Sequence, residues 1–232
     1  MKNSTLKAFI NFSFWTAISR VFGLLRDVLL AASLGAGPVS DAFFVAFKLP
    51  NMFRRLVAEG ALVQSFLPTF SFIEETNSKF QAQEFASYVQ SVILIVLLAI
   101  FIIAEIFMSY LIIGLAPGFI KNQEVLETAT NFARATIIYL PMLSVIAIWG
   151  SILQHSGKFM PSAASPIILN LSLISASLIF LSGQFSYDII ALSVPIAGIL
   201  QLLFLLFWLR KVRRIPKIII PNKNYKTYGV WR

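Results

Sequence analysis

The sequence predicts an all-α membrane protein with about six transmembrane helices. Hydrophobic residues make up 58% of the 232 positions, charged residues make up 12%, and the mean hydropathy is +0.81. A soluble domain carries about a quarter charged residues, so lipid is the solvent for most of this chain. A span needs about 20 mainly apolar residues, and the chain is long enough for about six spans with short loops.

The first two predicted helices cover about residues 4–34 and 40–73. Gly35, Gly37 and Pro38 end the first helix. The second stretch would be about 50 Å long at 1.5 Å per residue, which exceeds the hydrocarbon core. We expect it to break near residues 48–51, because Pro50 removes a helical hydrogen bond and disfavours helix at the residue before it.

Four more helices are predicted at about residues 81–115, 126–154, 161–181 and 187–210. Pro117 and Gly118 end the first of these, residues 155–160 and 182–184 form turns, and Pro141 lies inside the 126–154 helix. The predicted domain organisation is one six-helix transmembrane unit over residues 1–210. Residues 211–232 then form a basic segment outside the membrane.

The basic residues predict the orientation. The net charge is +9, and eight of the nineteen basic residues lie from Arg210 onward, directly after the last apolar run. Cytoplasmic loops are rich in Lys and Arg, so both ends of the chain are predicted to be cytoplasmic. This placement argues against a nucleic acid partner. The first apolar stretch is too long for a cleavable signal peptide and lacks a suitable cleavage site.

The composition also bears on catalysis and cofactors. The chain has no cysteine and a single histidine, His155, which the sequence places in a solvated loop. A site built from His and Cys clusters is therefore not expected, and neither a metal nor another cofactor is predicted. No nucleotide-binding loop or hydrolase motif is present. We expect a protein that is not an enzyme.

Besides Lys7 near the N-terminus, eight charged residues fall within the first two apolar stretches. They are Arg20, Arg26, Asp27, Asp41, Lys48, Arg54, Arg55 and Glu59. A charge at the bilayer centre costs at least about 2.5–3.5 kcal/mol, so such residues face protein or a water-filled cavity. Basic residues outnumber acidic ones in this set, which predicts a net-positive interior suited to an anion.

A polar stripe on the first helix supports a cavity. At about 100° per residue, an arc of roughly 140° contains seven polar or small residues: Ser13, Thr16, Ser19, Arg20, Gly23, Arg26 and Asp27. Such a stripe must face a hydrated interior or partner helices.

Two interpretations of the charges stay open. Arg26 beside Asp27, and Arg55 one turn from Glu59, favour structural ion pairs. Arg20 and Arg54 have no such neighbour at helical spacing, and an arginine fork matches phosphate oxygens. We therefore expect these two arginines to bind an anionic ligand.

These segments resemble a known family. Residues 19–27 (SRVFGLLRD), 41–51 (DAFFVAFKLPN), 54–61 (RRLVAEGA), 66–68 (FLP) and 116–119 (APGF) are similar in order and spacing to the MurJ (MviN) family of lipid II flippases. The resemblance is sharp over about the first 120 residues and looser but collinear beyond.

The resemblance implies one lobe of a two-lobed exporter fold, shared with multidrug exporters, that works by alternating access. The implied function is to move lipid II from the cytoplasmic to the periplasmic leaflet of the bacterial inner membrane for cell-wall synthesis. The implied substrate-binding residues are Arg20, Arg26, Arg54 and Asp41. Asp27, Arg55, Glu59, Gly23 and Pro50 are expected to support them.

The resemblance covers only the N-terminal half of the family's pattern, since the sequence stops at Arg232. An inactive remnant and a multidrug exporter are therefore the alternatives. The organic cations that such an exporter carries would be repelled by a net-positive cavity. The expected partners are lipid II, membrane lipids and proteins of the divisome or elongation complex, and the driving force is left open between an ion gradient and the membrane potential.

Overall fold

The computed structural model describes residues 2–57 and 61–220, with side chains over residues 10–54 and 62–220. All regular elements in these ranges are helices, as the composition predicts. They are α1 (Lys2–Leu34), α2 (Pro38–Val57), α3 (Ala61–Thr76), α4 (Lys79–Ile106), α5 (Met108–Leu115), the 3-10 helix η1 (Pro117–Lys121), α6 (Gln123–Ile137), α7 (Tyr139–His155), α8 (Phe159–Leu181) and α9 (Asp188–Val212).

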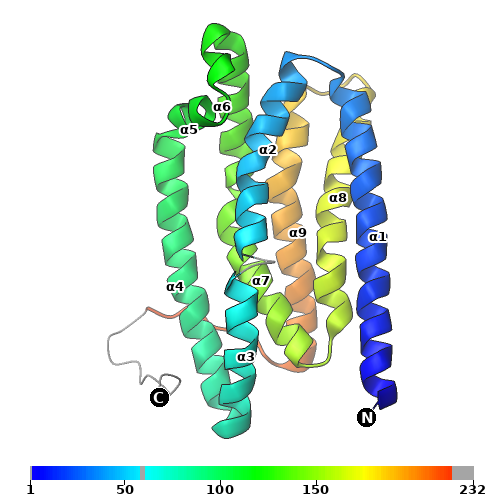
Figure 1. The fold of residues 1–232 in the computed structure, drawn as a ribbon, viewed down its shortest axis with the longest axis vertical. Helices are drawn as coiled ribbons and strands as arrows, with labels where there is room; N and C mark the ends of the chain where they lie inside the picture. Colours follow the sequence, from blue (N-terminus) through cyan, green and yellow to red (C-terminus); the bar gives the residue numbers. More distant parts are fainter. Residues whose placement is uncertain (1, 58–60, 221–232) are drawn as a thin grey trace.

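The long helices form one bundle (Figure 1). At one edge α1 packs along α8, and α8 packs on α9. At the other side α4 and α3 pack on α7, which also contacts α9, while α2 packs on α6. The start of α1 and the end of α9 lie at the same end of the bundle.

Left-handed glycines end two helices where the sequence predicts turns. Gly35 has φ +65° directly after α1, and Gly183 has φ +77° after α8. A positive φ favours glycine, because glycine has no Cβ to clash with the backbone. The first and fifth predicted helices therefore end where expected.

The predicted break at Pro50 is wrong. Helix α2 continues through Pro50 to Val57, and α3 begins at Ala61. Proline removes only its own backbone donor, and the buried Phe47 and Leu49 beside Pro50 anchor this part of α2 in the core. The long stretch is thus divided between α2 and α3, and residues 58–60 lie outside the described residues.

Two other predicted helices are each divided in two. The 81–115 stretch forms α4 and α5, which separate at Phe107 with φ −103° and ψ 19°. The 126–154 stretch forms α6 and α7, which separate at Ile138. Pro141 gives a physical reason for the second division, because it has no N–H to donate to the carbonyl of Ile137.

Four helical segments of the described chain are long and apolar enough to cross a membrane: α4, the continuous stretch of α6 and α7, α8 and α9. This is fewer than the six spans expected. The other two expected spans correspond to α1, which carries the polar stripe, and to α2 with α3. Helix α2 has 20 residues but carries four charged ones, and α3 has only 16 residues. The chain is a membrane protein, and the charges that the sequence places within its apolar stretches lie mainly on α1 and α2.

Buried aromatic side chains hold α2 in place. Phe43 of α2 and Phe132 of α6 are almost completely buried, and their rings meet edge to face with centroids 5.8 Å apart. Phe132 in turn contacts Tyr187, just before α9, at 5.4 Å. Such aromatic pairs stabilise the fold by about 0.5–1.5 kcal/mol beyond the effect of burying their surface. This packing fixes the helix that carries Arg54.

Candidate functional site: a cavity with a cationic wall

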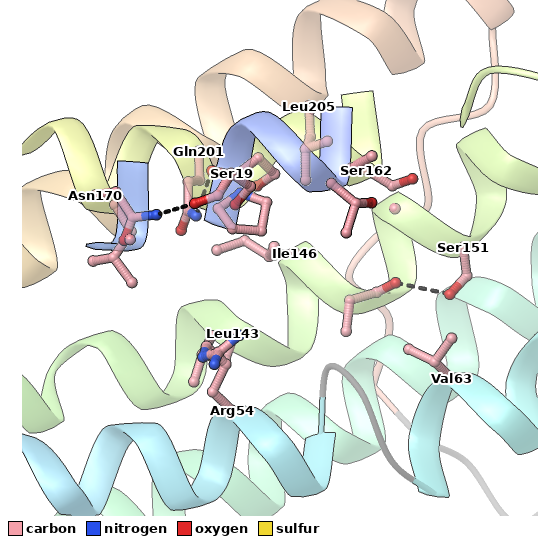
Figure 2. A pocket seen from close by; sticks show the side chains of 18 of the residues that line it. Ser19, Arg54, Val63, Leu143, Ile146, Ser151, Ser162, Asn170, Gln201 and Leu205 are labelled. Atoms are coloured by element: carbon pink, nitrogen blue, oxygen red, sulfur yellow. Dashed lines mark hydrogen bonds between the residues drawn. The ribbon is translucent and has the colours of Figure 1, made fainter. Parts of the chain in front are cut away.

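A cavity of about 570 Å³ lies between α1, α2, α7, α8 and α9, with one contribution from α3 (Figure 2). Its volume falls in the range of ligand-binding pockets. Its wall combines apolar residues such as Leu143, Ile146 and Leu205 with the polar groups described below.

The polar stripe of α1 forms one wall of this cavity. Thr16, Ser19, Arg20, Gly23 and Arg26 all line it. They recur every three or four residues, which places them on one face of the helix. Close packing of α1 on α8 turns this face inward. Five of the seven stripe residues thus line a cavity, whereas Ser13 and Asp27 do not.

Arg26 is held by two partners. Its Nε and Nη2 donate to Asp27 Oδ1 at 3.0 and 2.8 Å, and its Nη1 donates to Asn170 Oδ1 of α8 at 2.9 Å. The side chain of Arg26 is 20% exposed and that of Asp27 is 59% exposed. The predicted ion pair between Arg26 and Asp27 is thus confirmed, and Asp27 itself does not line the cavity.

Arg20 and Arg54 line the same cavity from different helices. Arg20 is exposed, and among the residues with described side chains it forms no ion pair. Arg54 extends from α2 toward Leu143 of α7 (Figure 2). Their role as ligands for an anion stays a prediction.

The remaining predicted residues are distributed differently. Gly23 lines the cavity beside Asn170, whose Nδ2 would lie 3.6 Å from a Cβ added at Gly23. Asp41 is exposed in the first turn of α2 and does not line the cavity. Pro50 is buried within α2. Glu59 and the side chain of Arg55 lie outside the described residues, so their predicted pairing stays a prediction.

Sequence reasoning missed a neutral polar wall. The Tyr139 hydroxyl donates to Gln201 Oε1 at 2.7 Å, and Gln201 Nε2 donates to the carbonyl oxygen of Ser165 at 2.8 Å. Gln154 Nε2 donates to Ser162 Oγ at 3.0 Å. All of these residues line the cavity. Glutamine within an apolar run was the available signal, because a buried amide needs hydrogen-bond partners.

A second polar cluster, formed by Ser71, Glu74, His155 and Arg214, lies where α3 and α7 end. Arg214 Nη2 donates to Glu74 Oε1 at 2.7 Å, and His155 Nε2 lies 3.1 Å from Glu74 Oε2. His155 Nδ1 is 2.8 Å from Ser71 Oγ. The expectation that His155 is solvated is wrong, since its side chain is only 17% exposed. The hydrogen bond from the Arg214 guanidinium lowers the pKa of Glu74. Glu74 lies directly after the second predicted apolar stretch, residues 40–73.

The segment after α9 docks on α4. The backbone N–H of Lys217 donates to Ser87 Oγ at 3.0 Å, and that of Ile219 donates to Ser91 Oγ at 2.8 Å. Alternate residues of an extended segment thus meet two serines one turn apart on α4. Together with Arg214, these contacts fasten residues 214–219 to α3 and α4.

The donor set of the cavity suits an anion. Its wall offers guanidinium, hydroxyl and amide groups and, within the described side chains, no carboxylate. In the described part of the chain, no group of three or more His, Cys, Asp and Glu residues is placed to hold a metal ion. Guanidinium groups bind phosphate oxygens through paired N–H donors.

The family model described as "Lipid II flippase MurJ" matches residues 30–227. The chain belongs to this family. A relative from Buchnera aphidicola, described as a probable lipid II flippase MurJ, is 37% identical over 227 residues, which is 97% of this chain and 43% of the relative. A relative of the same description from Rickettsia prowazekii is 40% identical over 201 residues, covering 86% of this chain and 39% of the relative.

Solved structures agree with this membership. The inward closed conformation of lipid II flippase MurJ has a TM-score of 0.74 and 28% identity, covering 90% of this chain and 44% of that one. An outward-facing MATE family transporter has a TM-score of 0.67 at 19% identity, which shows a shared fold alone. The chain spans less than half the length of these MurJ relatives. It matches one lobe of the two-lobed fold that the family resemblance implies.

Proposed function

We propose that this chain forms the N-terminal lobe of a lipid II flippase, which moves the lipid-linked peptidoglycan precursor from the cytoplasmic to the periplasmic leaflet. The observation that carries the proposal is the cavity wall shared by Arg20, Arg26 and Arg54. Charges in a membrane protein are retained at a cost. Three arginines around one cavity fit a ligand whose own charge is negative.

The chemistry of the wall matches a lipid diphosphate that carries sugars. The arginines suit the diphosphate. The neutral polar wall around Gln201 and Ser162 suits the hydroxyl and amide groups that the ligand carries next to its diphosphate. An organic cation, the cargo of a multidrug exporter, would meet repulsion from the same arginines.

The orientation of the lobe follows from its basic end. The start of α1 and the end of α9 lie at one end of the bundle (Figure 1). Arg210, Lys211, Arg213 and Arg214 are located at or just past the end of α9. By the positive-inside rule we place this end in the cytoplasm of a bacterial cell, with the helices in the inner membrane.

Charge removal in the cavity tests the proposal. With the full chain in lipid nanodiscs, we expect Arg20→Ala and Arg54→Ala each to weaken binding of lipid II by about tenfold or more, since a hydrogen bond to a charged group contributes about 1.5–3 kcal/mol. Lys121→Ala, at an exposed basic residue outside the cavity, is the matched control.

Unchanged affinity for lipid II in both arginine variants would contradict the proposal. Tight binding of an organic cation instead would favour the multidrug exporter. An assay that follows lipid II across proteoliposome membranes then tests transport itself.

A further inference from the structure

We propose that Asn170 is the positioning residue that orients Arg26 toward the diphosphate of the lipid. The inference rests on the proposed function and adds to it a residue on α8 that no arginine motif contains. Asn170 is buried and lines the cavity (Figure 2). Arg26 lines the same cavity.

The Asn170 amide makes two contacts with α1. Its Oδ1 accepts from Arg26 Nη1 at 2.9 Å, and its Nδ2 donates to the backbone carbonyl oxygen of Ser19 at 3.1 Å. The two contacts are made to residues seven positions apart on α1, which is about two helical turns. One side chain thus fixes both the guanidinium and the backbone from which the stripe projects.

Only an amide of this size serves both contacts. An amide has an acceptor oxygen and a donor nitrogen at its tip. A carboxylate would accept from Arg26 but could not donate to Ser19, and an apolar side chain would do neither. Gly23 brings α1 close to this amide, since a Cβ there would lie 3.6 Å from Asn170 Nδ2.

The contacts leave Arg26 able to bind a ligand. A guanidinium has five N–H donors. Two are directed to Asp27 and one to Asn170. One donor therefore remains on Nη1 and one on Nη2, on a group whose orientation is set by partners on both sides. Preorganised donors lose less entropy when a ligand binds.

A double-mutant cycle tests whether Asn170 acts through Arg26. The probe is a polyprenyl diphosphate, with the uncharged polyprenol as reference ligand, bound to the full chain in nanodiscs. We expect Asn170→Ala to weaken diphosphate binding about tenfold when Arg26 is present, and by less than about twofold in the Arg26→Ala background. In the Arg20→Ala background the tenfold loss should persist, because Asn170 makes no contact with Arg20 among the described hydrogen bonds.

Two further variants separate positioning from stability. Leu173→Ala removes a fully buried side chain of α8 outside the cavity, so it should lower the unfolding temperature without changing diphosphate affinity. Asn170→Asp keeps the size of the side chain and guards against a folding defect. It should also weaken diphosphate binding, because a carboxylate at this site repels the ligand and neutralises Arg26.

Each outcome supports or overturns the role of Asn170. Equal losses from Asn170→Ala in the presence and absence of Arg26, or normal affinity of Asn170→Asp, would overturn the role of Asn170. If Arg26→Ala weakens binding but Asn170→Ala does not, the positioning role fails while the proposed function stands. If the wild-type chain does not prefer the diphosphate to the polyprenol, the proposed function fails and this inference with it.

Discussion

Arg20 and Arg26 lie on one face of α1, less than two turns apart, yet their surroundings differ. Arg26 is bonded to Asp27 and Asn170 and is mostly buried. Arg20 is exposed and has no carboxylate partner among the described side chains. The charge of Arg26 is therefore partly compensated before any ligand arrives, whereas the charge of Arg20 is available to attract one.

Another single position controls how closely α9 approaches α7. A Cβ added at Gly198 would lie 2.5 Å from Met142 Sδ and 2.7 Å from Tyr139 Cδ2. The Tyr139 ring is buried and its hydroxyl donates a hydrogen bond to Gln201 Oε1, so the ring has little freedom to move. Glycine at this position therefore keeps Tyr139 at the cavity wall.

We expect Gly198→Ala to destabilise the chain by about 1–3 kcal/mol, which is the usual cost of overpacking. Gly114→Ala is the matched control, because a Cβ there meets no atom within 4 Å and alanine favours a helix over glycine. Thermal unfolding in detergent measures both. An unfolding temperature of Gly198→Ala equal to that of the wild type would contradict this account of the α7–α9 contact.

Helix α7 connects the neutral polar wall of the cavity to the second polar cluster. Gln154 lines the cavity, and the next residue, His155, contacts Glu74 and Ser71. Arg214, which lies just past the end of α9, donates a hydrogen bond to the same Glu74. The ends of three helices are thus tied together at one edge of the cavity.

The lowered pKa of Glu74 predicts a pH dependence. The carboxylate is favoured in the folded state, so its stabilisation is complete above its usual pKa of 4.5 and is lost as pH falls through the lowered folded value. The groups that face it are His155 and Arg214. We expect the unfolding temperature to fall below about pH 4.5 in the wild type, and to fall less in Glu74→Gln.

The neighbouring Glu75 supplies the control for this measurement, since it is exposed. Glu75→Gln should follow the wild-type pH profile. If Glu74→Gln and the wild type lose stability in parallel below pH 4.5, the cluster does not contribute as described.

The elements that sequence predicted well are those set by local chemistry. Gly35 and Gly183 mark turns because few other residues adopt a positive φ, and the period of α1 is visible in its own residues. Pro50 misled the prediction, because its cost in a helix was outweighed by the packing of Phe47 and Leu49, which a local pattern does not show.

The parts of the site that sequence could not predict depend on distant contacts. The pair of Arg26 and Asp27 was predictable from adjacency. The Asn170 contact with Arg26 joins residues 144 positions apart, and Glu74 meets Arg214 across 140 positions. Only the packing of α1 on α8, and of the segment after α9 on α3, brings these groups together.

The molecule as a whole is one lobe whose charged helices border a cavity and whose most apolar helix, α4, stands at the other edge (Figure 1). Relatives are more than twice as long, and two lobes around a central site are typical of alternating access. Residues 214–219 lie fastened to α3 and α4 at the end of this lobe.

The central claim is that the arginines of α1 and α2 border a water-filled cavity at bilayer depth. The chain has no cysteine, so single cysteines can report on it without background. Thr16→Cys and Ser162→Cys line the cavity, and Ile103→Cys is exposed on α4 outside it. The decisive measurement is the rate at which a charged, membrane-impermeant thiol reagent labels each variant in intact membranes.

The account predicts fast labelling at residues 16 and 162, slowed by added lipid II, and little labelling at residue 103. Equally slow labelling at all three positions would show that no water-filled cavity borders Arg20 and Arg54, and would contradict the account.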